Sequence, residues 1–391
     1  MGKVTKLEIT FANDVNVFPL GDTIKGEVVV EVSDEKDRGL NKVKGIWVQF
    51  KGEAKNKWKE ETEISVGDVD VSYTTKNKAK EEYFDSVKVL FGAGEDDPVI
   101  KDLEIPPGTH TYPFEYEVPY ASMPAPFEGK YGYVKYTVEA TVSLERAIAN
   151  TLHTEVKQFS MFGQELDLNV LPGMETPVKK EEQITNCCGC GSTVEMTITV
   201  GLPKQGYVPG EPIYFNGQID NLDKDERQGL KAKLVQKVKF RTSGDTQEEE
   251  GTVAKTADKI ECPKGRVTDY KFGPLLIPAV PPSGLPGCDI IGITYYIQVS
   301  NEGCDFTMEF PITIGTVPLR RSSPVKSDEV TVTSSEELPK DNGGVVYDAF
   351  VADDETPSMS FKEPNYLKSD DFLPSYRYFH FLVDTLPEPQ K

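Results

Sequence analysis

Six cysteines are the most reactive side chains in this sequence, and three of them lie close together. Cys187, Cys188 and Cys190 form a Cys-Cys-Gly-Cys run. Zinc sites usually separate paired cysteines by about two to four residues and add a second pair, so this run does not predict a metal ion. Two interpretations stay open: small buried thiols at the start of a domain, or S-acylated thiols in an exposed linker. We expect no metal and no cofactor.

A further thiol, Cys262, is followed closely by Lys264 and Arg266. Neighbouring cations lower the pKa of a thiol and make its thiolate reactive. This pattern supports the hypothesis that Cys262 forms a mixed disulfide with a thioredoxin-like protein. The competing interpretation is a reduced and inert thiol, because structural disulfides are rare in the cytosol.

Basic and apolar residues alternate between positions 231 and 241. The basic members are Lys231, Lys233, Lys237, Lys239 and Arg241. A strand places alternate residues on opposite faces, so these side chains would form a cationic ladder that could hold an acidic or phosphorylated segment of another protein. The alternative is neutralisation within the chain. Asp245 and Glu248 follow a turn at Ser243-Gly244 and would pair across a hairpin with the same ladder.

The sequence carries no recognisable catalytic motif. Gly-x-Ser-x-Gly, a phosphate-binding Gly-x-x-x-x-Gly-Lys and His-Glu-x-x-His are all absent. Its three histidines, His110, His153 and His380, lie far apart, which limits acid–base chemistry near neutral pH. We therefore expect a protein that is not an enzyme.

A repeated pattern must position these residues. Three short matches recur in the same order: 21–24 with 210–213, 48–49 with 235–236, and 134–138 with 293–297. Between them lie runs that alternate apolar and polar residues, separated by Pro/Gly clusters. For example, Val134, Tyr136, Val138 and Ala140 share one face of a strand. Short alternating strands of this kind predict an all-β chain built as two tandem antiparallel sandwiches.

The first copy carries roughly 30 extra residues between about Lys51 and Pro113, an insertion too long for a turn. Within it, Val69 to Leu90 has helix-like spacing of its apolar residues and is also compatible with a long exposed hairpin. We expect domains at 1–170 and 184–318, joined by a polar, proline-broken linker at 171–183. Residues 319–391 read as a flexible acidic tail with an aromatic docking segment at 363–382, because the rest is too polar to offset the entropy of ordering.

The formal net charge of −21 argues against nucleic-acid binding, since phosphate would be repelled. No stretch approaches the ~20 apolar residues that a membrane span needs. The amino end lacks the apolar run of a secretory signal. We expect a cytoplasmic protein.

Several segments together resemble one family. They are Gly21-Asp-Thr-Ile-Lys-Gly, the run from Phe127 to Tyr136, Cys187-Cys-Gly-Cys-Gly with Gly206-Tyr-Val-Pro-Gly-Glu, and the run from Cys288 to Tyr295. The chain is similar to proteins with tandem amino- and carboxy-terminal arrestin domains. The likeness covers most of residues 4–318 and is closer to arrestin-domain-containing proteins (alpha-arrestins) than to visual or beta-arrestins.

This resemblance implies two arrestin-like, immunoglobulin-like sandwiches and a non-enzymatic adaptor. Such proteins join cytoplasmic segments of membrane receptors or transporters to a HECT-type ubiquitin ligase, which leads to ubiquitination, endocytosis or endosomal sorting. The resemblance implies recruitment from the cytoplasm to the plasma membrane or endosomes, with peripheral membrane association only. A trafficking coat subunit that recruits no ligase remains an alternative, as does the redox partner suggested by Cys262.

In this family the ligase docks through Pro-Pro-x-Tyr motifs bound by WW domains, which accept a preformed extended segment. This sequence has no Pro-Pro-x-Tyr. Its nearest match is Leu373-Pro374-Ser375-Tyr376. Two interpretations stay open: a degenerate WW-docking motif, or an aromatic strand between Phe372 and Phe381 that folds back on the sandwiches.

Overall fold

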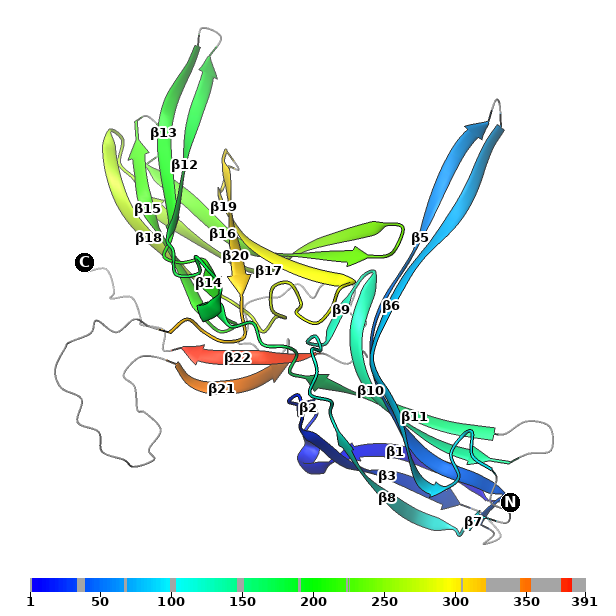
Figure 1. Cartoon of the computed structure of the whole chain (residues 1–391). Coiled ribbons are helices and arrows are strands. Elements are labelled where there is room, and N and C mark those ends of the chain that lie inside the picture. The colour runs from blue at the N-terminus through cyan, green and yellow to red at the C-terminus, as the bar shows by residue number, and fades with distance from the viewer. Residues whose placement is uncertain are drawn as a thin grey trace, which may run out of the picture.

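A computed structural model describes residues 2–33, 39–66, 69–98, 103–145, 151–188, 191–222, 224, 226–303, 305–320, 345–352 and 374–381. Over these ranges the chain folds into strands and two short 3-10 helices, with no α-helix. The strands build two β-sandwiches that lie next to each other (Figure 1). The expected all-β class with two antiparallel sandwiches is confirmed.

The first sandwich packs a three-stranded sheet, β1-β3-β8, against a larger sheet, β2-β11-β10-β5-β6, with β9 beside β10. Its strands are β1 (Lys3–Phe11), β2 (Val17–Phe18), β3 (Thr23–Ser33), β4 (Leu40–Asn41), β5 (Val43–Val66), β6 (Val69–Gly92), β7 (Glu104–Ile105), β8 (Gly108–Glu117), β9 (Phe127–Gly129), β10 (Gly132–Leu144) and β11 (Thr151–Met161). Strands β4 and β7 form a separate small pair. The 3-10 helix η1 (Ala12–Asp14) follows β1.

The second sandwich packs β12-β13-β15-β18 against β14-β20-β19-β16-β17. Its strands are β12 (Val178–Cys188), β13 (Gly191–Leu202), β14 (Gly206–Tyr207), β15 (Pro212–Asn221), β16 (Arg227–Arg241), β17 (Thr246–Glu261), β18 (Arg266–Leu276), β19 (Ile291–Asn301) and β20 (Thr307–Ile314). The 3-10 helix η2 (Leu168–Val170) leads into the connection between the sandwiches. Because β12 begins at Val178, the last positions of the segment 171–183 lie in a strand and not in a linker.

The two sandwiches share one strand plan. The larger sheet of each sandwich has the same strand order. A short strand lies at one edge and a pair of long strands at the other, as in β2-β11-β10-β5-β6 and in β14-β20-β19-β16-β17. The short strand is parallel to its neighbour in both copies. Gly21 and Gly210, which open corresponding strands, both have positive φ, at 78° and 88°. Glycine adopts this conformation without steric cost, which accounts for its presence in both copies.

The core lies between the paired sheets of each sandwich. On β10, Val134, Tyr136, Val138 and Ala140 are all buried, as their alternation predicts. The Tyr136 hydroxyl donates a hydrogen bond to the Pro124 carbonyl at 2.7 Å, so its polar atom is satisfied. Burial of these side chains from water is the main force that holds the sheets together.

The extra residues of the first copy form a long hairpin. Strands β5 and β6 pair from Gly45–Gly92 to Val66–Val69, and in Figure 1 the hairpin projects well beyond the body of its sandwich. We call this hairpin the arm. The segment Val69 to Leu90 is therefore a strand, as the hairpin interpretation predicts, and the helix interpretation is wrong.

The arm also contacts the second sandwich. The buried Asn56 side chain donates hydrogen bonds to the Arg241 carbonyl at 2.9 Å and the Ile290 carbonyl at 2.8 Å. The Trp58 indole donates to the Asp245 carboxylate at 2.8 Å. These hydrogen bonds join the arm to the second sandwich and help to fix one sandwich against the other.

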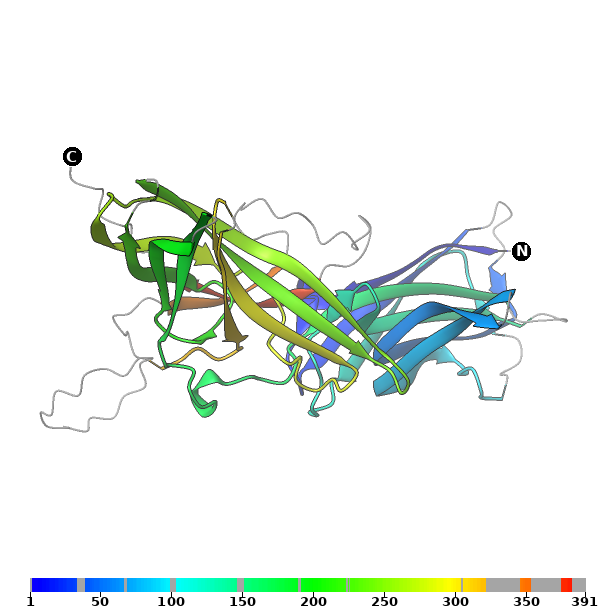
Figure 2. The ribbon, with the colours of Figure 1, turned by 90° about the horizontal axis from the view of Figure 1, so that it is seen from above.

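The tail is ordered in part. Strands β21 (Val345–Ala352) and β22 (Ser375–Phe381) form an antiparallel pair. In Figures 1 and 2, β22 lies at the junction between the two sandwiches. Tyr376, Tyr378 and Phe379 are only 6, 4 and 7 % exposed. The aromatic docking segment expected at 363–382 contains β22, whose aromatic side chains supply buried area at the junction. Residues 321–344, 353–373 and 382–391 lie outside the described residues.

Candidate functional site

The cationic ladder lies on β16. Ala232, Leu234, Val238 and Phe240 are buried in the second sandwich, and the basic residues between them lie on the outer face. The alternation that the sequence predicted is therefore observed. The antiparallel neighbour β17 faces this ladder through the hairpin that turns at positions 242–245.

One end of the ladder is neutralised within the hairpin. Lys237 Nζ lies 2.7 Å from Glu248 Oε2, and Lys239 Nζ lies 3.4 Å from Glu248 Oε1. The hydrogen bond to Glu248 raises the pKa of Lys237, and the same contact lowers the pKa of Glu248. Arg241 donates to the Asp289 carbonyl at 3.1 Å. Intramolecular pairing, the alternative considered from the sequence, thus describes this end.

The other end of the ladder is different. Lys233 lies directly opposite Lys255 of β17, and Lys231 is the next outer residue of β16. Like charges directly opposite each other destabilise a sheet. Within the described residues, these three lysines have no acidic partner within ion-pair distance. We call Lys231, Lys233 and Lys255 the lysine cluster.

The degenerate tail motif lies at the junction of the sandwiches. Leu373 is outside the described residues, and Pro374 and Tyr376 are buried. The Tyr376 hydroxyl donates to the Pro126 carbonyl at 2.9 Å, and the Ser375 amide donates to Ser160 Oγ at 2.9 Å. A WW domain must contact the proline and tyrosine side chains of its ligand. The motif is therefore not accessible while β22 is docked.

Strand β22 bridges the two sandwiches. Its Ser375 end contacts Ser160 of the first sandwich, and the Phe379 amide donates to the Pro209 carbonyl of the second at 3.1 Å. A Cβ at Gly210 would lie 1.8 Å from the Phe379 carbonyl oxygen, so any larger residue there would push the strand away. The fold-back interpretation of the tail describes this arrangement.

The cysteines do not form a reactive centre in the described structure. Cys262 is fully buried, and burial raises the pKa of its thiol. The expectation that Lys264 and Arg266 activate it is corrected, because desolvation of the thiolate is the main influence on its pKa and raises it. Cys187 and Cys188 pair in register with Ser192 and Gly191 near the end of β12, and Cys190 lies outside the described residues.

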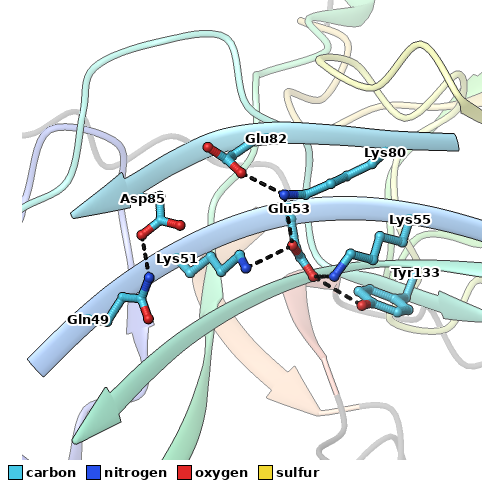
Figure 3. A network of polar contacts seen from close by, with 8 residues as sticks. All are labelled: Gln49, Lys51, Glu53, Lys55, Lys80, Glu82, Asp85 and Tyr133. Atoms are coloured by element: carbon cyan, nitrogen blue, oxygen red, sulfur yellow. Dashed lines mark hydrogen bonds and ion pairs between the residues drawn. The ribbon is translucent and has the colours of Figure 1, made fainter. Parts of the chain in front are cut away.

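A charged network that the sequence did not suggest lies at the base of the arm. Glu53, 8 % exposed, is surrounded by Lys51, Lys55 and Lys80 and accepts a hydrogen bond from Tyr133 at 3.1 Å (Figure 3). Burial alone would raise the pKa of Glu53, but Lys55, Tyr133 and Lys51 outweigh it and lower that pKa. Burial and Glu53 raise the pKa of Tyr133 to about 12.

This network ties β5, β6 and β10 together, since its members come from all three strands. Its sequence signal is the alternation of Lys51, Glu53 and Lys55, which places all three on one face of a strand. Among the described residues, no cluster of His, Cys, Asp and Glu has a geometry suited to a metal ion. The part of the chain that the structure describes also contains no helix long and apolar enough to span a bilayer.

Comparison with known proteins matches both sandwiches to family models. Residues 7–169 match "Arrestin (or S-antigen), N-terminal domain", and residues 192–319 match "Arrestin (or S-antigen), C-terminal domain". These two ranges correspond to the two copies of the strand plan.

Individual relatives agree with this match. The chain is 28% identical over 330 residues to Arrestin domain-containing protein 17 of Caenorhabditis elegans, covering 81% of this chain and 72% of the relative. It is 25% identical over 337 residues to mouse Arrestin domain-containing protein 4, covering 83% and 76%. For rat Arrestin domain-containing protein 1 the identity is 27% over 249 residues, covering 62% and 52%. The matched region thus spans only about half the length of that last relative.

Proposed function

The chain belongs to the arrestin family, with one N-terminal and one C-terminal arrestin domain, and from this premise we propose that it is a non-enzymatic adaptor in membrane-protein traffic. In this role it links cytoplasmic segments of receptors or transporters to ubiquitination, endocytosis or endosomal sorting. It works in the cytoplasm and is recruited peripherally to the plasma membrane or endosomes. The observation that carries the proposal is the pair of sandwiches that match the two arrestin family models.

The proposed cargo surface is the lysine cluster on the second sandwich. Lys233 and Lys255 stand directly opposite each other with Lys231 nearby, and an acidic or phosphorylated cargo segment would relieve the repulsion between these like charges. Lys237 and Lys239 have Glu248 as a partner, so they contribute less to the attraction. The ladder thereby divides into a binding half and a structural half.

Charge removal separates these halves. We expect Lys231→Gln with Lys233→Gln to weaken the binding of a fluorescent acidic peptide about tenfold or more at low salt, because two attractions are lost. The matched control, Lys237→Gln with Lys239→Gln, should change affinity less than about threefold. Equal losses from both double variants would contradict the division, and no loss from either would remove the cargo surface from this face.

Ligase recruitment through Leu373-Pro374-Ser375-Tyr376 is a separate part of the proposal, and it requires that β22 leaves the junction. A pull-down with an array of WW domains tests it with two baits, the full chain and the isolated segment 363–382. If the motif is functional, the isolated segment binds and the full chain binds far less. A Tyr376→Ala segment is the control and should not bind. Failure of the isolated segment would exclude ligase docking at this motif.

A second candidate is a trafficking subunit that recruits no ligase. The burial of Tyr376 and the absence of Pro-Pro-x-Tyr favour it. Proximity labelling in living cells distinguishes the two: ligases and membrane cargo together among the neighbours support the first role, and coat or sorting proteins without ligases support the second. Absence of any membrane or sorting protein among the neighbours would contradict both roles. The redox role of Cys262 has lost its physical basis, because the thiol is buried.

A further inference from the structure

A cavity of about 500 Å³ opens where the two sandwiches meet β22. All three parts of the chain contribute to its wall: Leu20 and Met161 from the first sandwich, Val280 from the second, and Tyr376 and Arg377 from the tail strand. Its size falls within the range of about 300–1,000 Å³ that is typical of small-molecule sites, and such sites are frequent at domain interfaces. Neither the lysine cluster nor the arm lies in it.

The wall has an apolar part and a charged end. Leu20, Met161 and Val280 supply the apolar part. At the charged end, Arg377 lies with its guanidinium over the Phe162 ring, 5.5 Å from the ring centroid. Its Nη1 is 3.4 Å from Glu165 Oε1 and 3.3 Å from the Thr316 carbonyl. Tyr120, 89 % exposed, also lines the cavity.

The pair between Arg377 and Glu165 is unequal. The Arg377 side chain is 23 % exposed, whereas that of Glu165 is 65 % exposed. A long ion pair with an exposed, hydrated carboxylate contributes little free energy. A carboxylate that reaches Arg377 from inside the cavity would be less hydrated and could accept two hydrogen bonds from the guanidinium. Glu165 is thus a displaceable partner for Arg377.

From this arrangement we propose that the cavity binds a small amphiphile with a single carboxylate and a linear apolar chain. The carboxylate pairs with Arg377 in place of Glu165, and the chain lies against Leu20, Met161 and Val280. Burial of a hydrocarbon chain from water drives binding, and the ion pair sets its orientation. The site is independent of the cargo surface proposed above.

The site depends on the docked tail, because Tyr376 and Arg377 belong to β22. A ligand that binds only this state stabilises it by mass action. The amphiphile therefore holds β22 at the junction and keeps Tyr376 buried. Its removal makes the tail easier to release.

Oleate, kept below its micelle-forming concentration, is the probe for the full chain, and oleyl alcohol is its uncharged counterpart. Isothermal titration should show one oleate per chain and at least tenfold weaker binding of oleyl alcohol. We expect Arg377→Gln to weaken oleate binding about tenfold or more, since a charged hydrogen-bond pair is lost. Arg377→Lys should retain binding within a few-fold, and Glu165→Gln should strengthen it, because it removes the competing carboxylate.

Two further measurements guard against misfolding and surface binding. Ala121→Trp, at an exposed position of the cavity wall, should block oleate while leaving the thermal unfolding temperature unchanged. Oleate should also slow amide hydrogen exchange in residues 375–381 of the unsubstituted chain. Binding that is equal in the unsubstituted chain, Arg377→Gln and Ala121→Trp would overturn the proposal. No binding, or binding without protection of β22, would also overturn it.

Discussion

Glu53 shows how one side chain can depend on several others. Its carboxylate is nearly buried and is kept ionised by Lys51, Lys55 and Tyr133. A buried carboxylate without such partners would be strongly destabilising. The network is therefore a structural charge centre in the sheet, and it has a pH dependence of definite sign.

The pKa of Glu53 is lowered in the folded state, so its ionised form stabilises the protein above the unfolded pKa, and this contribution is lost as pH falls through the folded pKa. We expect Glu53→Gln to lower the free energy of unfolding more at pH 7 than at pH 3. Urea unfolding at both pH values measures this. Glu63→Gln, at an exposed position of the arm, is the control. A loss that is equal at both pH values would show that packing, not charge, is what Glu53 provides.

At Cys262, the neighbouring basic residues in the sequence predict a reactive thiol, whereas its burial predicts an unreactive one. Lys264 and Arg266 are close in sequence, but the thiol is enclosed in the second sandwich. We expect Cys262 to react with a maleimide at least about 100-fold more slowly in the native chain than in guanidinium, because the thiolate is disfavoured and access is blocked. Peptide mapping by mass spectrometry follows the cysteines separately. Native labelling at the rate of a free thiol would restore the redox hypothesis.

At the scale of elements, the arm explains why a strand can resemble a helix. The pairing of β6 with β5 shifts register at Gly52/Glu53 and at Ile46/Trp47, so that Tyr83 and Leu90 are extra residues in bulges. Each bulge breaks the strict alternation of a strand. The apolar residues then recur at spacings that a helix would also give. Periodicity alone could not resolve this segment, although the alternation of β10 and β16 was predicted from sequence.

Asn56 makes two of the hydrogen bonds between the arm and the second sandwich. Its amide donates to two carbonyls of the other sandwich, and the side chain is 1 % exposed. We expect Asn56→Ala to lower the free energy of unfolding by about 1–3 kcal/mol, because two hydrogen bonds across the junction are lost, while the Ile290 carbonyl keeps the Arg241 amide as a donor. Lys59→Ala, at an exposed position three residues farther along β5, should change it by less than about 0.5 kcal/mol. Similar values for the two variants would mean that the arm does not hold the junction.

At the scale of the whole molecule, the tandem duplication was visible in sequence because both copies keep the same turn glycines and strand patterns. The way the copies are joined was not visible. Asn56 meets Ile290, and Tyr376 meets Pro126, across more than 200 residues of chain. No local pattern encodes such pairs. The aromatic spacing of the tail indicated docking, but it could not distinguish a WW domain from the chain's own sandwiches.

Removing the tail tests its structural role. We expect a chain that ends after Arg320 to lose about 3 kcal/mol or more of unfolding free energy, because Tyr376, Tyr378 and Phe379 no longer fill the junction. Adding the peptide 363–382 in trans should restore part of the thermal stability. Calorimetry of the full chain, the truncated chain and the truncated chain with peptide measures this. Unchanged stability on truncation would show that β22 does not stabilise the two sandwiches.

The position of β22 in the sequence determines when the junction is covered during synthesis. The ribosome completes both sandwiches before it makes this strand, which follows Leu319 by roughly 60 residues, or about 3–12 s at ordinary rates of synthesis of about 5–20 residues per second. During those seconds the nascent chain has folded halves and an uncovered junction. Nascent and completed chains therefore present different surfaces to chaperones. Only in the nascent chain can another molecule bind at the junction without competition from β22.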